Sequence, residues 1–329
     1  MEILVTGATG YIGNRLVEEL LKNGYKVRVL TRKPLEQYKN IAWGKEVVHV
    51  QSNLKDVDSI KKAVRGEEVV IHLAAQLGSW KAKQKDFIDI NYNGTRLLAN
   101  ESENASVQHF IYVSSAGVFG TLKRAPADET HPCNPRYPYE KTKFMAERYI
   151  LEKIKKGFPA TIIRPSHVYG PSDINTVPLL KVLKKFHFFP LIGGGRSLFQ
   201  PVYIDDLVKG IILVIKNRKN VCGNIYILAG KEAVTFKKYI QIISKILHIK
   251  VILFPFPYGL AKFTAVLNES IAKILNIEPV LTRFRVDFFG GHQCYNIKRS
   301  QNDFGFNPKV GLEQGIEKAE NWYRFHKLI

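Results

Sequence analysis

The fold of this 329-residue chain is indicated by residues 3–13, which read ILVTGATGYIG. A short apolar run is followed by three glycines, each three residues from the next, and then by an amphipathic stretch with helical spacing. Glycines at such a strand-to-helix turn let the backbone approach a pyrophosphate, whose charge is met by the free N–H groups at the helix start. We therefore predict a dinucleotide-binding loop. Its predicted cofactor contacts are Gly7, Thr9, Gly10, Tyr11, Ile12 and Gly13.

Beyond this loop, short apolar runs alternate with amphipathic stretches as far as the apolar run at residues 160–163. Continuous apolar strands joined by helical crossovers are typical of a parallel sheet covered by helices on both faces. We expect an α/β fold, namely a Rossmann-type doubly wound parallel sheet with a smaller C-terminal α/β substrate lobe. The looser pattern that follows predicts an NAD(P)-binding domain, residues 1–165 plus about 196–230, and a substrate-binding lobe, about 166–195 plus 231–329.

The composition is that of a globular protein, with 45% hydrophobic and 24% charged residues, which excludes the disordered and fibrous classes. The three cysteines are far apart and form neither a CxxC pair nor a metal-binding spacing with histidine. We therefore expect a cytoplasmic protein with no metal site. The chain starts without a signal-peptide layout, and the apolar run at residues 251–261 is short and interrupted by two prolines. No membrane span is expected.

The 49 basic and 29 acidic residues leave a net charge of +20. Such a charge suits nucleic acid, an anionic membrane surface or a phosphorylated ligand. The basic residues are spread along the chain rather than gathered in an arm, which favours a lysine-rich solvated surface. We expect a small-molecule substrate and no nucleic-acid partner.

The second predicted strand ends in VLTRK, residues 29–33, with no acidic residue. NAD-preferring sites usually place an acid there to bind the ribose 2′-hydroxyl. Arg32 can instead form a bidentate, charge-assisted pair with a 2′-phosphate. We predict a preference for NADP(H), with NAD(H) as the alternative cofactor and an ordinary surface arginine as the alternative interpretation of Arg32.

Two overlapping Tyr-x-x-x-Lys pairs occur in residues 136–143, which read RYPYEKTK. Tyr137 precedes a proline, which pushes it away from helical geometry, whereas Tyr139 follows that proline and can share a helix face with Lys143. We therefore choose Tyr139 and Lys143 as the catalytic pair. An ammonium one turn away, aided by an oxidised nicotinamide, is expected to bring the phenol pKa from about 10 toward the working pH. Tyr139 would then act as a proton shuttle.

A third catalytic residue is predicted after the buried strand at residues 110–113, where Ser114 and Ser115 follow. Open α/β sheets bind ligands at this edge, so Ser115 is placed to hold a substrate oxygen. The alternative is that both serines cap the next turn. Together, Ser115, Tyr139 and Lys143 describe hydride transfer at a carbinol or carbonyl.

Four further motifs occur in order along the chain: HLAA at 72–75, NYNGT at 91–95, RPSHVYGP at 164–171 and VYIDDL at 202–207. Together with the glycine loop, the serine and the Tyr-x-x-x-Lys pair, they make the whole chain resemble one family. This family is the extended short-chain dehydrogenase/reductases, or NAD(P)-dependent epimerase/dehydratase family.

The resemblance implies further residues that contact the cofactor or support its site: Asn53, Leu54, Leu73, Ala74, Ala75, Asn91, Tyr139, Lys143 and Pro165. Asn53 stands where the family often has an acid that contacts adenine, so only an amide hydrogen bond is expected there. The resemblance also implies a homodimer formed through Thr95–Asn100 and Tyr139–Leu151.

Residues near the catalytic serine separate the activities found within this family. Dehydratases that act on sugar nucleotides place an acid just after the serine or threonine, whereas Ala116 follows Ser115 here, which argues against dehydration. Many epimerases grip diphosphate with an Arg-Asp pair, which Gln200-Pro201 replaces here, although displaced arginines could serve. The tail, including residues 281–285, resembles dihydroflavonol reductase and 3-beta-hydroxysteroid dehydrogenase-like members, which act on fairly apolar substrates.

The favoured interpretation is an NAD(P)-dependent oxidoreductase that interconverts a secondary alcohol and a ketone or aldehyde, specifically an NADPH-dependent reductase or dehydrogenase of a fairly apolar substrate. The alternative is an NAD-dependent nucleotide-sugar epimerase similar to UDP-glucose 4-epimerase. A non-catalytic nucleotide-sensing or nucleic-acid-binding Rossmann protein is suggested only by the charge of +20. The candidate substrate contacts are Gln76, Gly117, Val118, His167, Arg196, Gln200 and Arg283.

The second lobe is rich in aromatic residues that could wall an apolar pocket, although such residues more often form ordinary core. They are Phe186, Phe188, Phe189, Phe254, Phe256, Tyr258, Phe288 and Phe289.

Overall fold

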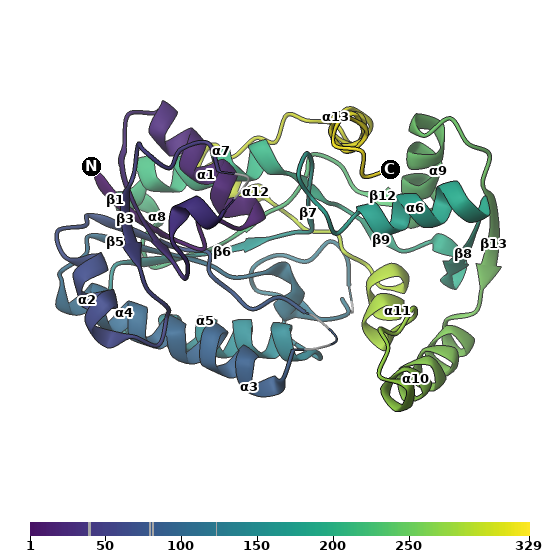
Figure 1. Cartoon of the computed structure of the whole chain (residues 1–329), viewed down its shortest axis with the longest axis horizontal. Helices are drawn as coiled ribbons and strands as arrows, with labels where there is room; N and C mark the ends of the chain where they lie inside the picture. Colours follow the sequence, from purple (N-terminus) through teal and green to yellow (C-terminus); the bar gives the residue numbers. More distant parts are fainter. Residues whose placement is uncertain (39–40, 79, 81, 123) are drawn as a thin grey trace.

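The computed structural model describes residues 1–38, 41–78, 80, 82–122 and 124–329, and it confirms the predicted α/β fold (Figure 1). A parallel sheet of seven strands has the order β11-β6-β5-β4-β1-β2-β3. The chain therefore winds in opposite directions on the two sides of β1 and β4, and open sheets bind ligands at such a switch point. The strands are β1 (Glu2–Thr6), β2 (Lys26–Thr31), β3 (Val48–Gln51), β4 (Val69–His72), β5 (His109–Val113), β6 (Ala160–Pro165) and β11 (Ile225–Leu228).

Helices cover both faces of this sheet and create two separate cores. Ile3 and Val5 of β1 pack in one core with Leu16 of helix α1, whereas Leu4 faces the other core with Leu98 of helix α4. The central strands β4, β5 and β6 are buried along their whole length, which explains why their sequences are continuously apolar. The helices on the α1 side are α1 (Tyr11–Lys22), α7 (Ile204–Lys216), α8 (Arg218–Val221) and α12 (Lys298–Phe304), and those on the α4 side are α2 (Val57–Val64), α4 (Thr95–Asn104) and α5 (Pro138–Lys155).

Short elements complete the rim of the sheet. The segment after β5 forms a 3-10 turn, and the segment before α4 is a π-helix that follows one turn of α-helix. These elements are η1 (Leu35–Gln37), α3 (Gln84–Phe87), η2 (Ile88–Gly94) and η3 (Ala116–Phe119). A further 3-10 turn, η4 (Gly193–Gly195), contacts β8 (Phe188–Ile192) in the smaller lobe.

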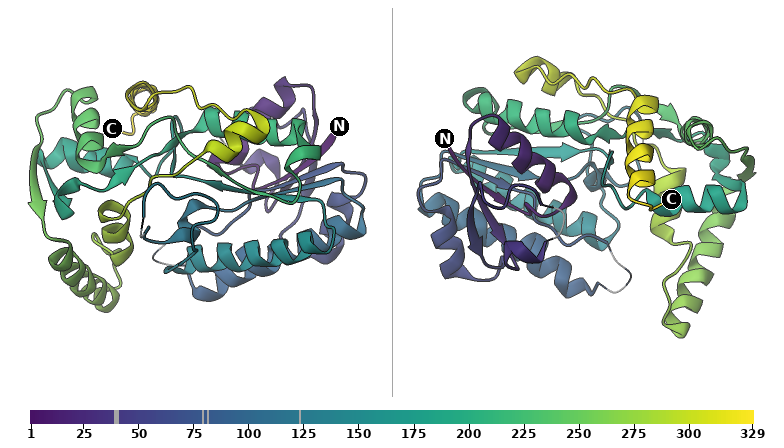
Figure 2. Two further views of the ribbon diagram at one scale, coloured as in Figure 1. Left: turned by 180° about the vertical axis from the view of Figure 1, so that it is seen from behind. Right: turned by 45° about the horizontal axis from the view of Figure 1, so that its top comes forward.

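A smaller lobe lies at the end of the molecule away from the N-terminus, with β8 and β13 at its outer edge (Figure 1). Three two-stranded sheets are formed by β7 (Val168–Tyr169) with β10 (Val202–Tyr203), β9 (Leu198–Phe199) with β12 (Val234–Thr235), and β8 (Phe188–Ile192) with β13 (Ile252–Phe256). The remaining helices are α6 (Val177–Phe186), α9 (Phe236–Ile246), α10 (Tyr258–Leu275), α11 (Arg283–Gly290) and α13 (Leu312–Phe325). Both views of Figure 2 show α10 projecting from this lobe.

The C-terminal part of the chain does not stay within the smaller lobe. Helix α12 contacts β11 and α8, which belong to the sheet and its cover, so the chain returns to the seven-stranded sheet before α13. The predicted domain boundaries stay a prediction. None of the helices in the described ranges combines the length and the apolar character that crossing a membrane requires.

Candidate active site

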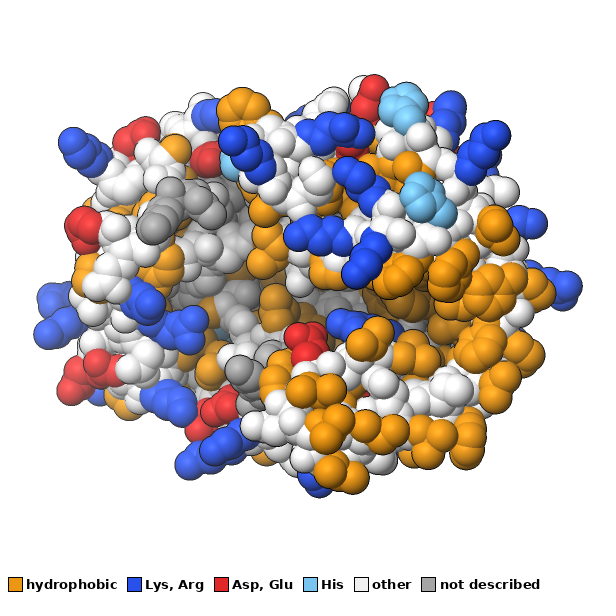
Figure 3. All heavy atoms as spheres, turned by 45° about the vertical axis from the view of Figure 1, so that its right-hand side comes forward, with side chains coloured by type: hydrophobic (Ala, Val, Ile, Leu, Met, Phe, Trp, Pro, Cys, Tyr) orange, Lys and Arg blue, Asp and Glu red, His pale blue; other side chains and the backbone are white. Residues whose placement is uncertain are grey.

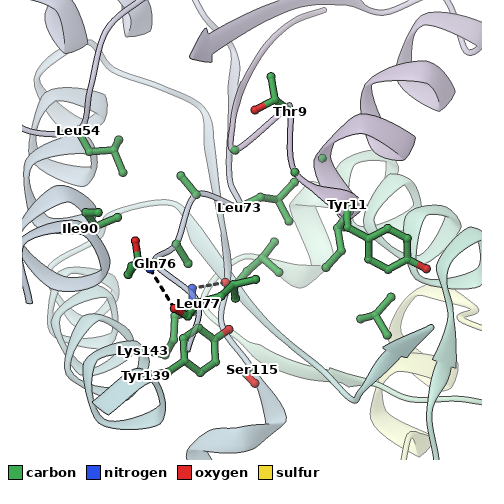
Figure 4. A pocket seen from close by; sticks show the side chains of 18 of the residues that line it. Thr9, Tyr11, Leu54, Leu73, Gln76, Leu77, Ile90, Ser115, Tyr139 and Lys143 are labelled. Atoms are coloured by element: carbon green, nitrogen blue, oxygen red, sulfur yellow. Dashed lines mark hydrogen bonds between the residues drawn. The ribbon is translucent and has the colours of Figure 1, made fainter. Parts of the chain in front are cut away.

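A cavity of about 740 Å³ opens at the carboxyl edge of the sheet, where the glycine loop meets the ends of β4, β5 and β6 (Figure 4). It brings together residues that are far apart in sequence, from Gly7 to His167. The predicted site residues that line it are Gly7, Thr9, Gly10, Tyr11, Ile12, Gly13, Arg32, Asn53, Leu54, Leu73, Ala74, Ala75, Gln76, Ser115, Tyr139, Lys143, Pro165 and His167.

The glycine loop fits a dinucleotide pyrophosphate. Gly7 has a φ of +73°, and a Cβ atom there would lie 2.6 Å from the backbone nitrogen of Ala74. A Cβ atom on Gly13 would lie 2.1 Å from the carbonyl oxygen of Gly7. Helix α1 follows Gly10 with no capping side chain and no acidic residue in its first turn. Its first N–H groups and the positive end of its dipole are therefore available to an anion.

The far end of the cavity is lined by basic and polar side chains. Arg32 is exposed at the end of β2 and lines the cavity, and within the described residues no aspartate or glutamate lines it. The Asn53 side-chain oxygen accepts the N–H of Lys55 at 2.8 Å, which leaves its amide N–H groups for a ligand. Tyr38 and Lys55 also line this end. Neither was predicted from the sequence, because neither belongs to a motif.

Lys143 lines the base of the cavity, where burial disfavours the charged ammonium form. Its side chain is 2% exposed, its Nζ donates to the carbonyl oxygen of Val113 at 2.6 Å, and it lies 4.3 Å from the centre of the Tyr112 ring. Burial lowers the pKa of Lys143 to about 7, and the negative charge of Glu147 opposes this shift only in part.

Tyr139 lies one turn before Lys143 on α5, as predicted, but its pKa moves in the opposite direction to the one expected. Burial raises the pKa of Tyr139 to about 12, and a hydrogen bond with the Ser115 hydroxyl offsets this only in part. The expectation neglected desolvation, which penalises the phenolate and the Lys143 ammonium alike. The protein alone therefore keeps the phenol protonated at neutral pH.

Ser115 caps the next turn and also lines the cavity, while its role toward a substrate oxygen stays a prediction. Its hydroxyl accepts the N–H of Gly117 at 3.0 Å, which caps η3, and it also lines the cavity beside Tyr139 (Figure 4). Ser114 also lines the cavity, but its hydroxyl donates to the Glu147 carboxylate at 2.7 Å.

The competing tyrosine makes a different contact. Tyr137 is the residue before α5, and its hydroxyl donates to the Asp287 carboxylate of α11 at 2.5 Å. Lys262 of α10 pairs with the same carboxylate at 2.6 Å. Burial raises the pKa of Asp287, but hydrogen bonds from these groups outweigh it and hold that pKa below its usual range. Asp287 thereby joins α11 to the start of α5, which supports the choice of Tyr139.

Asn91 supports the cavity from behind and does not line it. It is 1% exposed, its Oδ1 accepts the N–H of Gln76 at 2.6 Å, and its Nδ2 donates to Thr142 Oγ1 at 3.1 Å. Asn91 therefore occupies the supporting position rather than the lining, and a direct contact with the cofactor stays a prediction. A buried amide here positions the Gln76 backbone, because its donors and acceptors need partners within the protein.

A buried ion pair beneath α5 was missed by the sequence analysis. Glu147 pairs with Arg164 of β6 at 2.5 Å, and both side chains are almost fully buried. Glu147 lies one further turn beyond Lys143 on the same helix face as Tyr139, and this spacing was the available signal.

A second cavity of about 220 Å³ adjoins the first and shares Ser115, Tyr139, Pro165, Ser166 and His167 with it. Its other wall comes from α11 and the following loop. The Ser166 hydroxyl is buried and lacks a hydrogen-bond partner among the described residues. Burial lowers the pKa of His167, so its imidazole is neutral at pH 7. Ser166 was also missed, although it lies inside the RPSHVYGP motif.

Some of the predicted substrate contacts line the second cavity and others line neither. Gly117 and His167 line it, and Gln76 lines the first cavity. The four that line neither cavity are Val118, Arg196, Gln200 and Arg283.

The surroundings of these four residues hold them away from both cavities, and their role toward a substrate stays a prediction. Val118 is fully buried in the interior and Arg196 is exposed. The Gln200 side chain donates to the Gly230 carbonyl oxygen at 2.8 Å and accepts the N–H of Tyr295 at 2.7 Å. Arg283 pairs with Glu269 at 2.8 Å.

The aromatic residues of the second lobe mostly do not line the two cavities. Of the eight aromatic residues proposed for an apolar pocket, only Phe288 lines a described cavity, together with Phe284, which was not proposed. Phe189 and Phe289 pack in the core with Phe236. Several of the others are exposed on the outer surface of the lobe, namely Phe186, Phe188, Phe254 and Tyr258. Among the described residues, no cluster of histidine, cysteine, aspartate and glutamate suits a metal ion.

The chain aligns with known proteins over almost its whole length. The chain is 26% identical over 340 residues to the mouse (Mus musculus) sterol-4-alpha-carboxylate 3-dehydrogenase, decarboxylating, covering 98% of this chain and 91% of that protein. It is 28% identical to the putative UDP-glucose 4-epimerase of Methanocaldococcus jannaschii, covering 98% of each chain. The crystal structure of gox2253 matches 99% of both chains with a TM-score of 0.82 and 26% identity.

Residues 3–229 match the model of the NAD dependent epimerase/dehydratase family. This range contains the glycine loop, Ser115, Tyr139 and Lys143, which the structure brings to one cavity. The chain belongs to the NAD dependent epimerase/dehydratase family.

Proposed function

We propose that this protein is an NAD(P)-dependent oxidoreductase that interconverts a secondary alcohol and a ketone or aldehyde. The observation that carries the proposal is that Ser115 and Tyr139 line both cavities, while Lys143 lines only the first. The larger cavity would hold the dinucleotide on the glycine loop, and the smaller one would hold the substrate. When bound, the nicotinamide supplies or accepts the hydride.

The protein's residues would handle the substrate oxygen and its proton. The Ser115 hydroxyl would bind the carbonyl oxygen, and the Tyr139 phenol would donate its proton to that oxygen as the carbon becomes a carbinol. A phenol with a pKa raised to about 12 is protonated at neutral pH, which is the form that reduction needs.

The aromatic residues of the second cavity favour a substrate with an apolar part, and its polar residues would surround the reacting oxygen. Phe284, Phe288 and Tyr295 line it, and within the described residues no lysine or arginine does. The carboxylates of Glu140 and Asp287 line it instead. Asp287 is paired with Lys262 and Arg136, so the described lining offers no free cation to a diphosphate. The unpartnered Ser166 hydroxyl offers one polar contact to the substrate or the cofactor.

A nucleotide-sugar epimerase is the second candidate, because a putative UDP-glucose 4-epimerase aligns with the chain over 98% of each protein. That activity would need cations near the second cavity to hold a diphosphate. Arg196 and Arg283, the candidates for this role, line neither cavity. The reductase therefore stays the favoured proposal.

NADP(H) is the proposed cofactor, with NAD(H) as the alternative. Arg32 lines the first cavity at the end of β2 with no acidic residue among its described lining. A guanidinium there can bind a 2′-phosphate. We further propose a cytoplasmic homodimer formed through α4 and α5, without a nucleic-acid partner. Light scattering that shows only a 37.5 kDa species would contradict the dimer.

One experiment tests both the cofactor and the chemistry. Calorimetric titration with NADPH and NADH should show tighter binding of NADPH, and Arg32→Asp should remove roughly a tenfold preference. The neighbouring Lys33→Asp provides the matched control, because Lys33 does not line the cavity. NADPH oxidation with a panel of apolar ketones and aldehydes then tests turnover. NAD that is already bound and does not exchange would favour the epimerase.

A further inference from the structure

Helix α10 buries small side chains and exposes large apolar ones, which is the opposite of what is expected in a protein without a partner. Its buried residues are Ala261, Ala265 and Ala272, whereas its large apolar side chains point outward with 45% to 82% of their surface exposed. Amphipathic helices normally bury the large apolar side chains and expose the polar ones. The outward side chains are Leu260, Phe263, Val266, Leu267, Ile271, Ile274 and Leu275.

The exposed apolar surface continues beyond α10. Phe186, Phe188 and Phe254 form a chain of ring contacts, with ring centres 5.9 Å and 6.2 Å apart, on the outer strands β8 and β13 and the end of α6. Ile252, Ile277 and Val280 are more than half exposed as well. We call α10 and these residues the apolar face. Figure 3 shows hydrophobic side chains gathered at the lower right of the view, over this lobe.

Basic residues accompany the apolar face. Residues 174–204 and 233–268 contain no aspartate or glutamate. Lys185 Nζ lies 5.3 Å from the centre of the Phe186 ring, so positive charge directly borders the apolar side chains. Lys245 and Lys262 have acidic partners. The lysines of these two ranges that make no ion pair within the described residues are Lys181, Lys184, Lys185, Lys237, Lys238 and Lys250. The acids on and just after α10, Glu269 and Glu278, are paired with Arg283 and Arg285.

We propose that the apolar face docks on the surface of an anionic lipid bilayer. Exposed apolar side chains gain free energy by entering the acyl boundary, and bordering lysines gain by approaching anionic headgroups. Helix α10 has 18 residues, about 27 Å at 1.5 Å per residue, and it would lie along the surface. A second copy is a poorer occupant, because lysine-bordered faces would repel one another.

Docking would place the bilayer beside the entrance to the second cavity. Helix α11 packs against α10, and its Phe284 is 45% exposed while also lining that cavity. An apolar substrate could therefore pass from the bilayer to Ser115 and Tyr139. This consequence rests on the proposed function, whereas the docking itself does not.

Vesicle flotation with the full-length protein tests the docking without any turnover. We expect binding to phosphatidylcholine vesicles that contain about 30% phosphatidylglycerol, and at least roughly tenfold weaker binding to phosphatidylcholine alone. The double variant Phe263→Ser/Ile274→Ser should weaken binding roughly tenfold. The matched control is Phe325→Ser, because Phe325 is 83% exposed but lies on α13 outside the apolar face. Unchanged NADPH affinity would show that each variant is folded.

A second double variant measures how much the lysines contribute to vesicle binding. Lys184→Gln/Lys185→Gln should reduce binding to the anionic vesicles and leave the weak binding to neutral vesicles unchanged. Failure to float with anionic vesicles would overturn the proposal, as would equal losses from the α10 double variant and Phe325→Ser. Light scattering in which the α10 double variant halves the mass of the protein would assign the face to a second copy and also overturn it.

Discussion

Helices α5 and α10 have 18 residues each and bury opposite kinds of side chain. Helix α5 buries Lys143 and Glu147, both ionisable, against the sheet, whereas α10 buries only alanines and exposes phenylalanine, isoleucine and leucine. Burying charge costs free energy, so the buried ionisable residues of α5 are explained by the chemistry of the cavity that they adjoin. Exposing large apolar side chains to water also costs free energy, so the exposed side chains of α10 are explained by a binding surface outside the molecule.

The largest expected effect tests whether α5 carries the catalytic tyrosine. Tyr139→Phe removes the phenolic proton at the junction of the two cavities and should lower kcat about 10³-fold, with NADPH affinity retained. Tyr137→Phe is the matched control, because Tyr137 contacts Asp287 and lines neither cavity. Steady-state kinetics with the best carbonyl substrate measure both. Equal losses for the two variants would refute the assignment of Tyr139.

The next effect compares ion pairs on the two helices. Glu147→Gln leaves the buried Arg164 guanidinium without its counter-ion and should lower the free energy of unfolding by about 3 kcal/mol. Glu269→Gln removes the partner of Arg283, which is 57% exposed, and should cost less than about 1 kcal/mol. Urea denaturation compares the two. Similar costs would show that the α5 pair is not a strong stabilising element.

A smaller effect concerns pH. The pKa of Lys143 is lowered to about 7 by burial, so above that pH the unfolded chain holds a proton that the folded protein has lost. Stability should therefore rise with pH through this window. Relative to Lys143→Met, the wild type should gain roughly 2 kcal/mol between about pH 7 and 9.

The matched control for this pH effect is Lys141→Met, since Lys141 is an exposed lysine on the same helix. Its unfolding free energy should follow the wild type across the same pH range. A wild-type stability that runs parallel to that of Lys143→Met would contradict the burial of the Lys143 charge.

The smallest effect tests the other helix. Phe263→Ala on α10 should change the free energy of unfolding by no more than about 0.5 kcal/mol, because its side chain is 61% exposed. Ile150→Ala on α5 should cost about 3 kcal/mol, because Ile150 is fully buried. Thermal and urea unfolding in the absence of lipid measure both. A large cost at Phe263 would mean that α10 packs against protein rather than a membrane.

Much of the proposed cofactor-binding cavity was predictable from the sequence, because its motifs each span only a few residues. The glycine spacing, the strand before it and the Tyr139–Lys143 turn each lie within a few residues, and the structure brings them to one cavity. The proposed substrate cavity was not predictable in this way. The wall that faces Ser115 comes from α11, and its link to α5 joins Tyr137 and Asp287, which are 150 residues apart.

Local sequence alone determined that this chain forms a doubly wound sheet with a glycine loop, since backbone geometry and hydrophobic period act over short distances. Tertiary structure alone decided that burial raises the Tyr139 pKa, that Arg196, Gln200 and Arg283 line neither cavity, and that α10 turns its apolar side chains outward. Desolvation and exposure depend on neighbours brought together by folding, and these neighbours are not adjacent in the sequence.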